Sequence, residues 1–314
     1  MPWFFYYLEC AAMNYEVVSL PESHSLAYNV ALRLNKELVT PKVQEFADGE
    51  IEVVFEPNKF NQKKVMLIHA PYGNVHNALV RFALLAHSAS ISGAQEIIGI
   101  IPYLWYMRQD KSAVPGRVGA WQIIAKLLEA TGISQLITVE MHAAICEQMI
   151  TVPLYNIKLR VLMAEHIKHV VPECKQCCFI APDEGAFNRA QEIGQVFNMP
   201  VMVFKKKRFD VDKTKIISVS GSCGYDTVLI VDDIIATGGT AINACDKLRE
   251  MGIKKVYGYF VHPVLPGNAI ECIENSGFDR VFVSNSIPHT FDKQSKFTIF
   301  DISGVLAKKI KELV

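Results

Sequence analysis

The stretch that most constrains the fold is VLIVDDIIATGGT, at residues 228–240. Four apolar residues indicate a buried strand, two aspartates stand at its carboxyl end, and TGGT opens a predicted helix. Ligands of open α/β sheets bind outside the carboxyl ends of the strands. A phosphate at this turn would meet the N–H groups of a helix N-terminus, and two glycines would allow its close approach. The pattern therefore predicts an α/β sheet with a phosphate site at one strand end.

Apolar, β-branched runs alternate with amphipathic stretches along the rest of the chain. The predicted strands are residues 65–69, 97–102, 136–139, 178–181, 201–204, 227–231, 256–261 and 280–283. The predicted helices include residues 77–90, 118–129, 161–169 and 241–251. This alternation indicates a mostly parallel sheet with helices on both faces.

The same pattern occurs twice in the chain. VMLIHAPYG, SGAQEIIGIIPY and ATGISQLITVEMH in the first half correspond in order to VLIVDDIIATGG, MGIKKVYGYFVHP and NSGFDRVFVSNS in the second. In both halves a turn with a small residue and glycine ends a helix before the next strand. We therefore predict two similar domains, at residues 13–155 and 156–314, with residues 1–12 as a candidate extension.

Charge and cysteine usage exclude several classes of function. Lys+Arg and Asp+Glu number 32 each, so no global field favours nucleic acid. No apolar run reaches membrane length, and the apolar N-terminus lacks the basic residues of a signal peptide. The eight cysteines include one cluster, Cys174, Cys177 and Cys178, without the second pair that a zinc site normally needs. We expect a cytoplasmic protein that binds neither nucleic acid nor membranes.

The stretch at 228–240 resembles the phosphoribosyl-binding signature of type I phosphoribosyltransferases and of ribose-phosphate pyrophosphokinases. A plain glycine-rich turn after an acidic strand end is the alternative interpretation. The resemblance implies two type I phosphoribosyltransferase-like domains, each a mostly parallel sheet flanked by helices, because the pyrophosphokinases usually have two such domains. The residues that would bind ribose 5-phosphate are Asp232, Asp233, Ala236, Thr237, Gly238, Gly239 and Thr240.

Further segments resemble the pyrophosphokinase family in the same order along the chain. They are FADGE (46–50), MRQDK (107–111), VEMHA (139–143), APDEGAFNRA (181–190) and KKKR (205–208). Each has a structural explanation when taken alone, such as a tight turn, a solvated helix start, a hydrogen-bonded histidine or a surface charge run. Their joint order favours the family.

Two of these segments imply a nucleotide site. In the family the FADGE loop reaches adenine in a neighbouring subunit, and the arginine and glutamine of the second segment hold ATP. The residues that would bind ATP are Phe46, Asp48, Gly49, Glu50, Arg108, Gln109 and Asp110. The shared site implies a homo-oligomer built from dimers, usually a hexamer.

The remaining segments imply a metal and a catalytic group. By resemblance, His142 and Asp183 are Mg²⁺ ligands, and Lys206 and Arg208 are catalytic. The residues of the pyrophosphate loop are Asp183, Glu184, Gly185 and Arg189. The implied reaction transfers a diphosphoryl group from ATP to ribose 5-phosphate, giving AMP and phosphoribosyl pyrophosphate.

Three departures from the family pattern keep alternatives open. Ala236 stands where the family usually has an acid, and Glu140 replaces an aspartate. No tail follows Val314 to help form a regulatory site, so we expect phosphate activation and ADP inhibition to be absent. Ala236 favours a non-catalytic or regulatory relative as the alternative function. A phosphoribosyltransferase that acts on a base is a further alternative, although it would need no ATP-binding segments.

Overall fold

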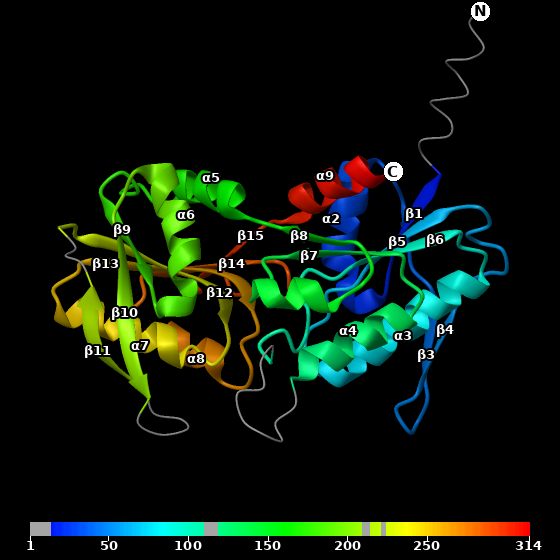
Figure 1. The fold of residues 1–314 in the computed structure, drawn as a ribbon, viewed down its shortest axis with the longest axis horizontal. Helices are drawn as coiled ribbons and strands as arrows, with labels where there is room; N and C mark the ends of the chain where they lie inside the picture. The colour runs from blue at the N-terminus through cyan, green and yellow to red at the C-terminus, as the bar shows by residue number, and fades with distance from the viewer. Residues whose placement is uncertain (1–13, 110–118, 209–213, 221–223) are drawn as a thin grey trace, which may run out of the picture. The chain divides into compact units, whose positions relative to one another are not determined.

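The computed structural model describes residues 14–109, 119–208, 214–220 and 224–314 (Figure 1). The chain divides into two compact units. Unit 1 contains the described residues up to Ile157 together with Ser286–Pro288 and Ile302–Val314, and unit 2 contains the described parts of Lys158–Asn285 and His289–Asp301. Each unit has its own mostly parallel sheet and its own helices, which confirms the predicted α/β class.

Unit 1 is built on a six-stranded parallel sheet with the order β2-β1-β5-β6-β7-β8. Its strands are β1 (Tyr15–Ser19), β2 (Leu38–Val39), β5 (Lys64–Ile68), β6 (Glu96–Ile100), β7 (Gln135–Val139) and β8 (Leu154–Ile157). Its helices are α2 (His24–Leu34), α3 (Val75–Ile91), α4 (Ala120–Ala130) and α9 (Ser303–Leu313), with short turns η1 (Pro21–Ser23) and η2 (Ala144–Met149). The inner strands read as continuous apolar runs because they are buried on both faces.

A separate antiparallel hairpin of β3 (Lys42–Glu45) and β4 (Ile51–Val54) follows β2. Figure 1 shows it extending from unit 1 beside α3. None of its apolar side chains is buried, and Val54 is exposed. An isolated hairpin is only marginally stable in water. The uncovered apolar side chains of this hairpin are therefore available for a further contact.

Unit 2 has a seven-stranded sheet with the order β11-β10-β9-β12-β13-β14-β15. Its strands are β9 (Cys177–Ala181), β10 (Val201–Arg208), β11 (Thr214–Ser220), β12 (Thr227–Ile235), β13 (Lys255–Pro263), β14 (Arg280–Ser284) and β15 (Phe297–Phe300). Its helices are α5 (Arg160–Val170), α6 (Phe187–Phe197), α7 (Gly239–Glu250) and α8 (Ala269–Glu274), with the turn η3 (Glu184–Ala186). Among the described strands of this sheet, β10 and β11 form the antiparallel pair, and the other neighbours are parallel.

Apart from the extra edge strand β11 of unit 2, the two sheets share one strand order, which confirms the predicted repeat. In unit 1 the chain runs from β1 outward to β2 and then from β5 to β8 on the other side. In unit 2 it runs from β9 outward to β10 and then from β12 to β15. The direction reverses between β1 and β5 in one unit and between β9 and β12 in the other. Ligands of such sheets bind at this reversal.

The last helix, α9, belongs to unit 1, whereas the predicted domains placed residues 156–314 together. It lies against α2, where Arg33 Nε donates a hydrogen bond to Ser303 Oγ at 2.7 Å. The amphipathic pattern of a helix indicates which side is apolar, and it does not indicate which sheet will cover that side.

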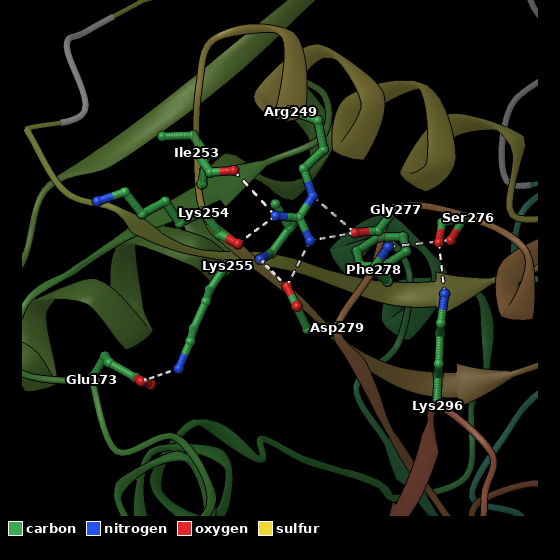
Figure 2. Close-up of polar contacts among 11 residues, drawn as sticks. Glu173, Arg249, Ile253, Lys254, Lys255, Ser276, Gly277, Phe278, Asp279 and Lys296 are labelled. Atoms are coloured by element: carbon green, nitrogen blue, oxygen red, sulfur yellow. Dashed lines mark hydrogen bonds and ion pairs between the residues drawn. The ribbon is translucent and has the colours of Figure 1, made fainter.

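Helix α7 is tied at its C-terminal end by Arg249 (Figure 2). The guanidinium donates to the carbonyl oxygen of Gly277 through Nε at 3.0 Å and through Nη2 at 2.6 Å. Nη2 also donates to Asp279 Oδ2 at 2.8 Å, and Nη1 donates to the carbonyl oxygens of Ile253 and Lys254 at 3.1 and 2.5 Å. Because these partners lie in the turns before β13 and β14, one side chain joins the helix to the start of two strands.

Replacing Arg249 by methionine should lower the free energy of unfolding by about 2 kcal/mol, because several hydrogen bonds from a charged donor are lost. Lys247→Met is the matched control, since Lys247 forms an exposed ion pair with Glu250 on the same helix at 2.8 Å. That control should change stability by no more than about 0.5 kcal/mol. Urea unfolding followed by far-UV circular dichroism measures both values, and equal midpoints for the two variants would contradict the assigned role.

Candidate active site

Strand β12 carries two aspartates, and helix α6 supplies their counter-ion. Arg189 of α6 has Nη1 3.2 Å from Asp232 Oδ1 and Nη2 3.3 Å from Asp233 Oδ2. Asp233 is 2% exposed, whereas Asp232 is half-buried. The resemblance placed Arg189 in the pyrophosphate loop, and the structure pairs it with the acids of the neighbouring strand.

The acids form a cluster with perturbed ionisation. Burial raises the pKa of Asp232 well above its ordinary value, and the charge of Asp233 adds to this effect. The positive charge of Arg189 opposes the rise in pKa of Asp232. The negative charge of Asp183 adds to the rise, so Asp183 is a third carboxyl group in the cluster. The charges of Asp233 and Asp183 therefore both act on the carboxyl group of Asp232.

The loop after β12 leaves the N-terminus of α7 open. Gly238 precedes the first turn with a φ of 79°, and among the described residues no side chain caps this helix. A Cβ at Gly238 would lie 2.9 Å from Ile273 Cγ1, so glycine alone fits there without a shift. A Cβ at Gly239 would meet nothing closer than Thr237 Oγ1 at 3.9 Å. The structure therefore requires glycine at position 238 and leaves position 239 without close packing.

The equivalent turn of unit 1 is closed by its own side chain. Asn74 stands before α3, and its Oδ1 accepts hydrogen bonds from the N–H groups of His76 at 2.9 Å and Asn77 at 3.3 Å. These are the groups that a phosphate would need. The repeat therefore reproduces the strand order in unit 1 without an open helix start.

The predicted pyrophosphate loop follows β9, the direct neighbour of β12. Asp183 caps the turn Glu184–Ala186 by accepting the N–H of Ala186 at 3.2 Å. Asp183 is half-buried, and Glu184 and Gly185 are exposed. This loop and the glycine loop therefore lie at the carboxyl ends of two adjacent strands, at the point where the chain direction reverses.

Lys206 and Arg208 lie on β10, which continues beyond the predicted strand 201–204. β10 pairs with β9 as far as Val203 and with β11 as far as Arg208. A bulge interrupts the second pairing between Lys205 and Lys206. The side chains of Lys206 and Arg208 lie outside what the structure describes.

The nucleotide residues predicted after β6 lie on an exposed turn. Arg108 and Gln109 are exposed, while Trp105 and Met107 of the same turn are buried in unit 1. Asp110, the third predicted residue, lies outside the described residues. The turn therefore has a polar outer side held to the core by two large apolar side chains.

The FADGE segment forms the tip of the β3–β4 hairpin. The N–H of Phe46 donates to the carbonyl oxygen of Glu50 at 2.8 Å, and the N–H of Gly49 donates to that of Phe46 at 2.9 Å. Gly49 has a φ of 89°, and Asp48 Oδ1 accepts the N–H of Glu50 at 3.2 Å. Phe46 is 44% exposed, so the tip presents an aromatic ring next to two carboxylates.

His142 is exposed and follows β7, while the preceding Glu140 is buried with a φ of 42°. Within the described ranges no group of three or more histidine, cysteine or acidic residues is arranged to hold a metal ion. His142 lies in unit 1 and Asp183 in unit 2, so their assignment to one ion stays a prediction.

The repeated sheet, with an open helix start beyond an acidic strand, defines a type I phosphoribosyltransferase-like α/β protein. Residues 15–132 match the family model of the N-terminal domain of ribose phosphate pyrophosphokinase. Residues 181–314 match the model of the phosphoribosyl synthetase-associated domain. The chain belongs to the ribose-phosphate pyrophosphokinase family.

Individual relatives agree with this assignment over nearly the whole chain. The ribose-phosphate pyrophosphokinases of Staphylococcus aureus (strain COL) and Staphylococcus haemolyticus (strain JCSC1435) are each 29% identical to it over 299 residues. Each alignment covers 94% of this chain and 92% of the relative. The crystal structure of phosphoribosylpyrophosphate synthetase from Mycobacterium smegmatis matches with a TM-score of 0.86 at 25% identity, covering 96% of this chain and 98% of that one.

Asp232→Asn should stabilise the ligand-free protein near neutral pH. Because the pKa of Asp232 is raised by folding, its protonated form stabilises the native state below the ordinary carboxyl pKa of about 4. That stabilisation is lost as pH rises through the raised pKa, because the carboxyl group then ionises. Asparagine does not ionise, so the variant keeps the stabilisation. The melting temperature of the variant should exceed that of the wild type at about pH 8, and the difference should shrink toward about pH 4.

Asp226→Asn is the matched control, because Asp226 is exposed and pairs with Lys254 at 2.8 Å. We expect no gain in melting temperature from this control at either pH. A gain in Asp232→Asn that does not depend on pH would contradict the assigned pKa direction.

Proposed function

We propose that this chain is a ribose-phosphate diphosphokinase, which converts ATP and ribose 5-phosphate to AMP and 5-phosphoribosyl 1-pyrophosphate. The observation that carries the proposal is the open N-terminus of α7 directly beyond the acids of β12. This loop supports binding of a sugar phosphate. Family membership through both domains supports ATP, and not a base, as the second substrate.

The sugar phosphate would bind with its phosphate on the loop after β12. The proposed contacts to the phosphate come from Thr237, Gly238, Gly239 and Thr240, with Ala236 at the edge of the loop. Asp232 and Asp233 would accept hydrogen bonds from the ring hydroxyls. Arg189 holds both carboxylates in place through its ion pairs, so the acceptors are positioned before the sugar arrives.

The reaction needs placement more than covalent help. The oxygen of the anomeric hydroxyl forms a bond to the β-phosphorus of ATP, and the bond from that phosphorus to the oxygen bridging the α-phosphate breaks. AMP leaves with the bond electrons, and the hydroxyl proton passes to solvent or to a nearby base. An in-line arrangement of the attacking and leaving oxygens accounts for most of the acceleration in such transfers.

The residues present are suitable for magnesium. Bound Mg²⁺ neutralises charge on phosphate oxygens and orients them. Asp183 is proposed for this role because the residue is half-buried and its charge acts on the neighbouring acid Asp232. Mg²⁺ retains several waters, so His142 and Asp183 would be sufficient protein ligands.

Lys206 and Arg208 would supply positive charge to the transferred diphosphoryl group. Arginine can bond two oxygens with its planar fork, whereas lysine acts as a compact charge. Their backbone lies on β10, whose neighbour β9 leads into the Asp183 loop. This arrangement supports a role for both residues in unit 2.

The nucleotide would be held by exposed residues of unit 1. Arg108, Gln109 and Asp110 are the proposed phosphate contacts, and Phe46 the proposed adenine contact. The hairpin β3–β4 that carries Phe46 leaves its apolar side chains unburied, which supports contact with a second copy of the chain. We therefore propose a homo-oligomer in which the hairpin tip completes the ATP site of a neighbouring subunit.

A reducing compartment is proposed for the protein. Among the described residues, six cysteines are in the thiol form, and five of them are buried. Such usage is typical of cytoplasmic proteins. Within the same part of the chain, no helix has both the length and the hydropathy that crossing a bilayer requires.

A second candidate function is a catalytically weak or regulatory relative that binds the same ligands. Ala236 favours it, because this position of the loop usually carries an acid in the family. The retained Lys206, Arg208, His142 and Asp183 favour an active enzyme.

Lys206→Ala should reduce the release of AMP from ATP, Mg²⁺ and ribose 5-phosphate by about 10³-fold, because a charge that stabilises the transition state is lost. Lys254→Ala is the control, since Lys254 is an exposed lysine of the same unit paired with Asp226 at 2.8 Å. Chromatographic measurement of AMP with and without the sugar checks the result. AMP release that does not need the sugar, or that is the same in both variants, would rule out the proposed enzyme.

Ala236→Asp should raise kcat/KM for ribose 5-phosphate by about tenfold, because it restores a charged acceptor beside the sugar. Ala236→Asn is the control for size without charge. If the wild type binds both substrates without AMP release and Ala236→Asp releases AMP, the weak relative is the correct function. An unchanged rate in Ala236→Asp would mean that the missing acid does not limit the reaction.

A further inference from the structure

We propose that Met107 is a positioning residue that holds Arg108 and Gln109 at a fixed spacing from His142. The inference rests on the proposed function, in which Arg108 and Gln109 bind the phosphates of ATP and His142 holds magnesium. All four residues lie in unit 1, so their spacing is determined within one compact unit.

Met107 contacts the loop of His142 directly. Its side chain is 1% exposed and lies in the turn after β6. Its sulfur accepts a hydrogen bond from the backbone N–H of His142, with 3.4 Å between the nitrogen and Sδ. The residue next to Arg108 is thereby joined to the predicted metal ligand across 35 positions of the sequence.

A second chain of hydrogen bonds closes a ring around the same turn. The carbonyl oxygen of Met107 accepts the thiol of Cys146 at 3.5 Å, and the carbonyl oxygen of Cys146 accepts Trp121 Nε1 at 2.9 Å. The backbone N–H of Trp121 then donates to the carbonyl oxygen of Gln109 at 3.4 Å. Cys146 and Trp121 are both fully buried. Gln109 is therefore linked through α4 and the turn Ala144–Met149 back to Met107.

Strained backbone lies on both sides of this contact. Tyr106, directly before Met107, has a φ of 63°, and Glu140, two residues before His142, has a φ of 42°. Residues other than glycine rarely adopt a positive φ unless surrounding contacts impose it. The hydroxyl of Tyr106 is 2.6 Å from Nδ1 of His76, a residue of α3, so this contact links the strained Tyr106 to that helix. The turn that contains Met107 and the loop that contains His142 thus both include backbone conformations that are unfavourable without surrounding contacts.

The chemistry of methionine suits this position. Its long unbranched side chain fills irregular space, and its sulfur is a weak acceptor. Leucine has similar volume and no acceptor, so Met107→Leu removes the bond to His142 while keeping the packing. A displacement of binding groups by about 1 Å is enough to weaken their joint action substantially. We expect the combined binding of ATP and Mg²⁺ to be lost, and not the fold.

Calorimetry with ATP and Mg²⁺ in the absence of ribose 5-phosphate tests the proposal, because no transfer can then occur. Met107→Leu should raise the Kd of ATP, and the Mg²⁺ concentration needed for half-maximal binding, each by about tenfold. Met66→Leu is the matched control: Met66 is fully buried in β5 of the same unit and belongs to no predicted site. Cys146→Ala, which removes the thiol donor to Met107, should weaken binding in the same direction. The Kd of ribose 5-phosphate should stay unchanged in all three variants.

Unchanged ATP and Mg²⁺ binding in both Met107→Leu and Cys146→Ala would overturn the proposal. So would an equal loss in Met66→Leu, or a parallel loss of ribose 5-phosphate binding, because either indicates general destabilisation. A wild type that binds ATP with Mg²⁺ and releases no AMP when the sugar is added would refute the proposed function, while the fold-change in Kd would still decide the role of Met107. A wild type that does not bind ATP would overturn both.

Discussion

The ion pairs of Arg189 with two adjacent carboxylates are the interaction on which the proposed sugar site depends. Asp232 and Asp233 follow each other in β12, and Asp233 is almost completely buried. Two such acids repel each other and resist ionisation unless a cation is close. Arg189 reaches them from α6, which follows the loop after β9, so the pairs join this helix to the end of β12. The same contacts that stabilise the strand end also hold the acceptors that a sugar would use.

The two units show that a repeated fold does not require a repeated site. Both sheets reverse direction at equivalent strands, and in both a helix begins after the central strand. The difference lies in one residue before each helix: Gly238 leaves the N–H groups of α7 open, and Asn74 bonds to those of α3. An anion would have to displace the amide of Asn74 to bind in unit 1. Of the predicted nucleotide residues of unit 1, Arg108 and Gln109 lie instead after β6, one strand away from its reversal point, and those between 46 and 50 lie at the tip of the β3–β4 hairpin.

Much of the fold could be predicted from the sequence because buried parallel strands read as continuous apolar runs. β12 was predicted to end at residue 231, and it continues to Ile235. A pair of acids normally ends a strand, and here Arg189 compensates them from a helix whose position the sequence pattern does not specify. The amphipathic pattern of α9 likewise does not specify that the helix packs in unit 1. The contact between Met107 and His142 depends on a turn with strained backbone at Tyr106, which no local pattern encodes.

The proposed site combines parts of different rigidity. The glycine loop follows β12, which has a parallel partner on each side, so its position is fixed by two ladders of hydrogen bonds. Lys206 and Arg208 lie where β10 has passed the end of its pairing with β9, and there β11 is the described neighbour. A strand held by one partner, next to a bulge, opens at lower free energy than a central strand. Groups that bind the substrate before reaction benefit from preorganisation, whereas groups that act on the transferred phosphates must let those phosphates enter. The central strand β12 therefore suits the proposed binding groups, and the pair β10–β11 suits the proposed catalytic groups.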